Sequence, residues 1–200
     1  DDYRVLATVQ QDASWLNPAH EDNYYIAAAI LPWEGQLDAA QVILRRATLA
    51  RPFDYQPPFY YAFNLVHFRQ DGMAAAEWLR RAAPYLPDPD ERLIMESFAA
   101  RWLDRTQDLE LAASIVDSMA AQTRNRGFAD HLRQRAQRLR DLAALRQAAL
   151  DYAAQRGGPP QSLKELVTAG VIARLPADPL GAGFELDAQG MPVFAKGTRP

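Results

Sequence analysis

The sequence predicts an all-α protein, built as an array of helical hairpins with a long capping helix and a small mixed tail. Ala, the strongest helix former, occurs 36 times in 200 residues. Apolar residues recur at helical spacing across residues 1–156, between separators rich in Pro and Asp. The pattern stops at Gly157-Gly158-Pro159-Pro160. We therefore predict two domains, a helical repeat domain at 1–156 and a small α/β tail at 157–200.

Composition excludes several classes of function. The formal net charge is -3, which argues against nucleic acid as the main partner because phosphate binding needs a basic surface. Cysteine is absent, so disulfides, thiol nucleophiles and iron–sulfur clusters are excluded. Apolar runs are too short to span a bilayer. The chain begins at Asp1 without Met, which we interpret as a processed or trimmed product.

The clearest internal pattern begins in the first helical hairpin. The residue spacings fit a turn, then a tightly packed second helix, then the end of that helix. The residues concerned are Gly35, Ala40, Leu44, Ala47 and Pro52. The first helix of this copy carries its aromatic and small residues at Tyr24, Ala27, Ala28 and Leu31. A unit of about 34 residues, from about Glu21 to Asp54, is thereby predicted.

Two further copies follow. In the second copy the matching residues are Ala75, Leu79, Ala82 and Pro87, with Phe59, Ala62, Phe63 and Val66 on its first helix. The third copy is weaker and contains Ala99, Ala100, Leu103, Ala112, Val116 and Met119. Glu96 stands where an aromatic residue is expected. Upstream of the first copy, residues 3–13 resemble the second helix of a preceding unit.

On these residues the chain resembles the tetratricopeptide repeat family over roughly residues 1–123. A generic array of helical hairpins is the alternative, and the two differ little in architecture. The resemblance implies a non-catalytic interaction module whose partner lies on the first helix of each pair. No metal, cofactor or catalytic residue is implied.

The predicted groove combines aromatic, amide and basic side chains. Its candidate residues are Tyr25, Trp33, Tyr60, Asn64, His67, Phe68, Arg101 and Arg105. Tyr, Trp and Arg are common anchors of protein interfaces, and the Asn64 amide suits the backbone of an extended peptide segment. Two uses of the aromatic residues stay open: binding a partner, or packing against other segments of the same chain.

A long helix is predicted from about Gly127 to Gln155. Arg126, Arg133 and Arg140 recur on one of its faces at a spacing of seven residues. We interpret this face as the solvated outer surface of a capping helix. The alternative is a patch for anionic lipid headgroups or an acidic partner.

The tail predicts a short helix and a β-hairpin. The run from Ser162 to Glu165 is a capping box that begins the helix, and Gly170 ends it. Phe184–Leu186 and Pro192–Phe194 flank a turn that contains Gly190, which predicts the hairpin.

Several positions of this tail carry a second resemblance. They are Tyr152, Gly158, Pro160, Leu163, Leu166, Gly170, Leu175, Pro176, Asp178, Pro179, Gly181 and Phe184. The run is similar to the C-terminal segment of type II secretion major pseudopilins, and to a tail of bacterial membrane-anchored tetratricopeptide proteins. Pseudopilins bind calcium with this region, but the required ligand set is not visible here. The resemblance implies the bacterial periplasm, with an inner-membrane anchor upstream of Asp1.

Catalytic and metal-binding patterns are absent from the sequence. No nucleophile elbow, phosphate-binding loop or dinucleotide fingerprint is present. His20-Glu21-Asp22 is a short run of potential metal ligands, which we interpret as a helix start capped by Asp22 or a neighbour. We therefore expect no enzyme activity, no cofactor and no metal.

Together these observations predict an adaptor or scaffold that binds protein partners, in a secretion or pilus type of envelope assembly. The alternative is a permanent accessory subunit of a larger membrane-bound enzyme complex. Nucleic acid is not an expected partner.

Overall fold

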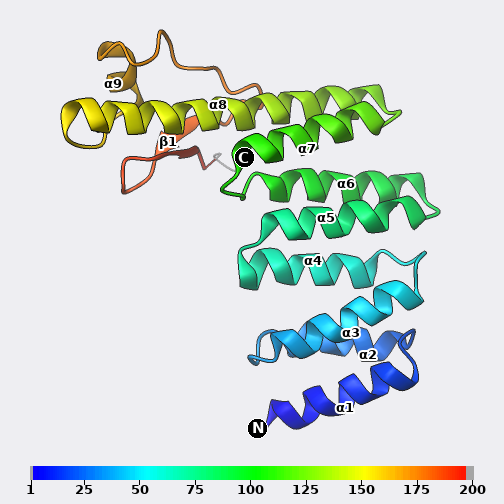
Figure 1. The fold of residues 1–200 in the computed structure, drawn as a ribbon. Coiled ribbons are helices and arrows are strands. Elements are labelled where there is room, and N and C mark those ends of the chain that lie inside the picture. Colours follow the sequence, from blue (N-terminus) through cyan, green and yellow to red (C-terminus); the bar gives the residue numbers. More distant parts are fainter. Residues whose placement is uncertain (1, 197–200) are drawn as a thin grey trace. The chain divides into compact units, whose positions relative to one another are not determined.

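The computed structural model describes residues 2–196, which are mostly helical with a small two-stranded hairpin near the C-terminal end. This confirms the predicted helical class and the hairpin (Figure 1). The chain divides into two compact units, residues 1–106 and 107–200. The predicted boundary at residue 156 falls inside the second unit, because the tail packs against the long helix instead of forming a body of its own.

The first unit is a stack of antiparallel helices that follow one another in chain order (Figure 1). Its elements are α1 (Tyr3–Leu16), α2 (Glu21–Ile30), α3 (Leu37–Ala50), α4 (Gln56–Arg69), α5 (Gly72–Ala82), the 3-10 turn η1 (Ala83–Tyr85) and α6 (Pro89–Leu103). Apolar contacts at the N-terminal end centre on Tyr24, Leu31, Ile43 and Leu44, which are almost completely buried. Burial of these side chains holds the neighbouring helices together.

Local sequence explains most of the helix ends in this unit. Pro57 and Pro58 fall in the first turn of α4, where the missing N–H of proline removes no helical hydrogen bond. Gln70 ends α4 in the left-handed conformation, with φ of 56°. Asp71 then accepts a hydrogen bond from Ala74 N at 2.9 Å and begins α5. The helix predicted to be capped by Asp22 or a neighbour has His20 as its N-cap residue, but without a side-chain bond, and Glu21 and Asp22 lie in the first turn.

The buried residues repeat along the chain. Ala27, Ala62 and Ala99 lie on first helices, are 0% exposed and follow one another at intervals of 35 and 37 residues. Second helices show the same two intervals at Ala40, Ala75 and Ala112, each also 0% exposed. Because the side chain of alanine is small, a buried alanine lets two helix backbones approach closely.

The second unit consists of two packed helices and the tail. Its elements are α7 (Leu109–Gln122), α8 (Arg126–Arg156), α9 (Leu163–Thr168), β1 (Phe184–Leu186) and β2 (Pro192–Phe194). The long α8 agrees with the predicted helix. The two strands pair antiparallel, with Phe184 opposite Phe194. Leu145 and Ala148 of α8 form a small core with the buried Leu166 of α9.

The predicted capping box of α9 forms only in part. Ser162 is the N-cap residue but makes no side-chain cap bond. Glu165 Oε2 accepts instead from the backbone N–H of Gln161, at 3.0 Å, and from the hydroxyl of Tyr152, also at 3.0 Å. Glu165 therefore ties α9 to α8, which a pattern based on neighbouring residues alone does not reveal.

The arginine face of α8 is largely neutralised within the second unit. Arg133 Nη1 pairs with Asp130 Oδ1 at 2.6 Å, and Arg140 pairs with Asp117 of α7. These ion pairs favour the interpretation as a solvated outer face over a patch for lipid headgroups, because the carboxylates already balance the charge.

Candidate functional site

The face of the first unit formed by α2, α4 and α6 contains two neighbouring hollows. The first has a volume of about 250 Å³ and lies between α2 and α4. It is lined by Tyr25, Ala28, Ala29, Phe59, Tyr60, Phe63 and Asn64. Two predicted anchors meet here, since the rings of Tyr25 and Tyr60 lie edge to face with centroids 6.2 Å apart. The small side chains of Ala28 and Ala29 leave the space that these rings border.

The second hollow adjoins the first at Phe59. It has a volume of about 330 Å³ and lies between the start of α4 and α6. Its lining residues are Tyr55, Phe59, Glu91, Ile94, Met95 and Phe98. The rings of Phe59 and Phe98 lie edge to face at 5.1 Å. We refer to the two hollows together as the aromatic groove.

Sequence reasoning missed the central residue of this groove. The repeat pattern assigns Phe59 to the first helix of the second copy but not to the groove, whereas in the structure it is partly buried and lines both hollows. Its place between Pro58 and Tyr60, in an aromatic run at the start of α4, was the available signal. The environment of Phe59 on α4 depends on how α2 and α6 pack against this helix.

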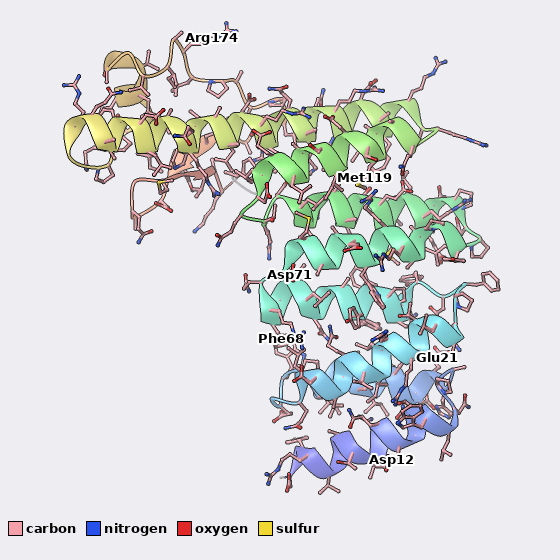
Figure 2. The ribbon with its side chains drawn as sticks, in the orientation of Figure 1. Asp12, Glu21, Phe68, Asp71, Met119 and Arg174 are labelled. Carbon is pink, nitrogen blue, oxygen red and sulfur yellow. The ribbon has the colours of Figure 1, made fainter. Side chains whose placement is uncertain are left out.

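Three predicted residues form a separate ring cluster at the other end of α4. Figure 2 shows Phe68 at the C-terminal end of this helix. The ring of Trp33 lies 5.0 Å from Phe68 and 5.1 Å from His67, between centroids. His67 also stacks on Phe63 at 5.3 Å, which links the cluster to the first hollow. Trp33 remains 57% exposed, so the cluster is packed within the chain and still presents surface.

The side-chain amide of Asn64 is not available to an incoming peptide. The residue is 3% exposed, and its Nδ2 donates to Gln41 Oε1 at 3.0 Å. Gln41 in turn donates to the backbone oxygen of Tyr61 at 3.2 Å. Because these amides satisfy one another, Asn64 forms the floor of the first hollow and orients α4 against α3.

The two predicted arginines do not line either hollow. Arg101 and Arg105 are exposed, and the guanidinium of Arg101 lies 5.7 Å from the centre of the Phe98 ring. Arg101 therefore borders the second hollow through Phe98, whereas Arg105 lies beyond it at the end of α6.

The aromatic groove is close to neutral. Glu91 is the one charged residue among those that line it. Burial raises the pKa of the Tyr60 hydroxyl above its ordinary value, so this group stays protonated near neutral pH. The groove therefore offers ring faces, hydroxyl groups, one carboxylate and apolar surface.

Within residues 2–196, no cluster of three or more His, Asp or Glu side chains is arranged to hold a metal ion. None of the helices described is long and apolar enough to cross a membrane. Comparison with protein-family models, with curated proteins and with solved structures finds no match for this chain.

Proposed function

We propose that this chain is a non-catalytic interaction scaffold whose aromatic groove binds an extended, largely apolar segment of a protein partner. The observation that carries the proposal is the position of two hollows that share Phe59 as a lining residue and lie along three helices, α2, α4 and α6. Such a track suits an extended chain better than a compact small molecule, since a peptide places successive side chains in successive pockets.

The repeat architecture supports this function. The fully buried alanines recur at intervals of 35 and 37 residues, slightly longer than the 34-residue unit of a tetratricopeptide array. In such arrays the same helix of each pair builds one extended binding surface. Here α2, α4 and α6 are the helices in question, and they provide the hollows.

The chemistry of the groove favours a protein partner. Tyrosine and phenylalanine give a large contact area at small entropic cost, and tyrosine adds a hydroxyl for hydrogen bonding. The exposed fraction of Tyr25 is 53%, so a partner gains apolar burial on contact with it. Periplasmic location and an anchor upstream of Asp1 stay predictions from the resemblance of the tail.

The test uses a double variant of the two tyrosines. A partner is captured by the wild-type chain from detergent-solubilised membranes, identified by mass spectrometry, purified, and titrated by calorimetry. Tyr25→Ala/Tyr60→Ala should raise Kd at least about tenfold, because aromatic anchors at the centre of an interface carry a large share of its free energy.

The matched control is Leu111→Ala/Leu150→Ala, which removes two comparably exposed apolar side chains from the second unit. It should leave Kd within about twofold of wild type. If the partner instead co-purifies at a fixed ratio with every variant, the groove is not its site, and the chain is a permanent subunit held by another face.

A further inference from the structure

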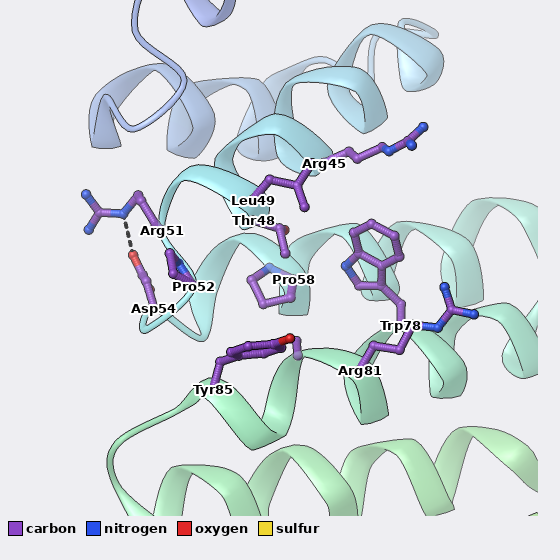
Figure 3. A pocket seen from close by; sticks show the side chains of 11 residues that line it. Arg45, Thr48, Leu49, Arg51, Pro52, Asp54, Pro58, Trp78, Arg81 and Tyr85 are labelled. Atoms are coloured by element: carbon purple, nitrogen blue, oxygen red, sulfur yellow. Dashed lines mark hydrogen bonds and ion pairs between the residues drawn. The ribbon is translucent and has the colours of Figure 1, made fainter.

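A separate pocket of about 490 Å³ lies among the second helices of the first unit (Figure 3). It is formed by α3, by the chain that leads into α4, and by α5 with η1. Its lining residues are Arg45, Thr48, Leu49, Arg51, Pro52, Asp54, Pro58, Trp78, Arg81, Ala82 and Tyr85. None of them lines the aromatic groove, so the two sites are independent. The volume lies in the ordinary range of small-ligand sites.

The walls of this pocket carry exposed apolar surface. Leu49 is 73% exposed and Tyr85 is 61% exposed, on opposite sides of the pocket. Single exposed apolar residues are common, but a concave cluster of them indicates a binding site. Pro58 and Ala82 complete the apolar lining.

One residue that lines this pocket carries an unsatisfied hydrogen-bond donor. Trp78 Nε1 is buried, and no acceptor for it exists among the described residues. Its ring is stacked on Tyr61 with centroids 4.2 Å apart, which fixes the direction of the N–H. In Figure 3 the nitrogen lies on the edge of the indole nearest to Pro58. A buried donor of this kind is costly unless a ligand or solvent supplies the acceptor.

The charges around the pocket leave one cation without a counterion. Arg51 Nε pairs with Asp54 Oδ2 at 2.8 Å, and Arg81 pairs with Glu77. Arg45 pairs with no carboxylate in the part of the chain that the structure describes. One uncompensated positive charge matches a monoanion such as a carboxylate better than a doubly charged phosphate.

We propose that this pocket binds an aromatic or apolar monocarboxylate. The apolar body packs among Leu49, Pro58 and Tyr85. A carboxylate oxygen accepts the N–H of Trp78 once the side chains that cover this nitrogen shift, and Arg45 at the rim balances the charge. The C-terminal residue of a peptide and a free aromatic acid both present this chemistry.

The test monitors the indole N–H signals by nitrogen-15 NMR, where four tryptophans give four separable resonances. Trp78→Phe assigns the relevant signal by its disappearance. Addition of N-acetylphenylalanine should shift the Trp78 signal saturably, with Kd of about 1 mM for a ligand of this size. Its amide, N-acetylphenylalanine amide, lacks the charge and should bind about tenfold more weakly.

Arg45→Gln should weaken binding of N-acetylphenylalanine about tenfold, since the positive charge that balances the carboxylate is lost. Arg124→Gln makes the same change of charge at an exposed site in the second unit and should have no effect. The proposal is overturned by equal binding of acid and amide, by equal loss in both arginine variants, or by a Trp78 signal that does not saturate.

A third ligand distinguishes the two sources of the carboxylate. If 3-phenylpropionate binds as tightly as N-acetylphenylalanine, the site takes a free acid, because the amide of the ligand adds nothing. If it binds several-fold more weakly, the site takes a peptide C-terminus, because the amide makes contacts of its own. Both results support a carboxylate site in this pocket. Neither result changes what is expected of the aromatic-groove experiment.

Discussion

At the residue scale, three positions that the predicted repeat makes equivalent carry three different side chains. They are Tyr24, Phe59 and Glu96, at intervals of 35 and 37 residues. Tyr24 is 1% exposed, and its hydroxyl donates to Asp54 Oδ2 at 3.0 Å. Burial and this hydrogen bond hold the pKa of Tyr24 well above its ordinary value. Phe59 fills the same position without a polar group, and Glu96 places a carboxylate there.

Glu96 gives a prediction for the pH dependence of stability. Desolvation raises the pKa of Glu96, against the smaller opposing effects of Arg92 and Arg80. The folded state therefore binds this proton more tightly than the unfolded state, so folding stability falls as pH rises from about 4.3, the ordinary pKa, through the raised value. Glu96→Gln removes the titration. We expect the variant to gain stability relative to wild type between pH 4 and pH 7.

Urea unfolding at these two pH values measures the difference. Glu91→Gln is the control, since it makes the same substitution on the same helix, at a residue that lines the second hollow. If wild type and Glu96→Gln differ in free energy of unfolding by the same amount at pH 4 and pH 7, the raised pKa is not that of Glu96.

At the element scale, the turn from α4 to α5 depends on three consecutive residues. Gln70 reverses the chain, Asp71 caps α5, and Gly72 is its first residue. A Cβ added at Gly72 would lie 2.3 Å from the backbone oxygen of Trp102 in α6. The absence of a side chain is therefore what allows α5 and α6 to pack at this distance.

Gly72→Ala should destabilise the first unit by about 1–3 kcal/mol, because the clash is with backbone and neither helix can move aside cheaply. Gly127→Ala is the matched comparison. A Cβ at Gly127 meets only Asn125 Oδ1, at 3.6 Å, so the higher helix propensity of Ala should stabilise α8 by up to about 1 kcal/mol. Thermal unfolding followed by circular dichroism compares both, and equal effects of the two substitutions would refute the packing argument.

At the scale of the whole molecule, the chain consists of two units with different means of cohesion. The first is held by apolar contacts between helices that follow one another in sequence. The second also contains a buried ion pair, between α8 and the tail. Arg138 Nε donates to Asp178 Oδ2 at 3.0 Å, with side chains only 9% and 1% exposed. Asp178 also accepts from the backbone N–H of Gly183 at 2.7 Å and of Leu180 at 2.9 Å.

Removal of this carboxylate should loosen the tail. Asp178→Ala removes one carboxylate partner of the buried Arg138 and the acceptor of two backbone donors, so we expect a loss of about 3–5 kcal/mol in the second unit. Asp130→Ala breaks the exposed pair with Arg133 on the same helix, which should cost at most about 1 kcal/mol. Hydrogen exchange of the β1–β2 amides reports both effects, and similar protection in the two variants would argue against a structural role for Asp178.

The sequence by itself determined the helical class, the long α8, the hairpin and the positions of the buried alanines, because these follow from short-range spacing and turn residues. It also identified Tyr25 and Tyr60 as groove residues, since repeat position alone assigns them to the first helices. The tertiary structure decided what those residues do. It buried Asn64 against Gln41, placed Phe59 between two hollows, left the predicted arginines outside them, and joined the tail to α8 through Arg138 and Asp178. These outcomes depend on contacts between residues far apart in the chain, and no local pattern encodes which partner each side chain meets.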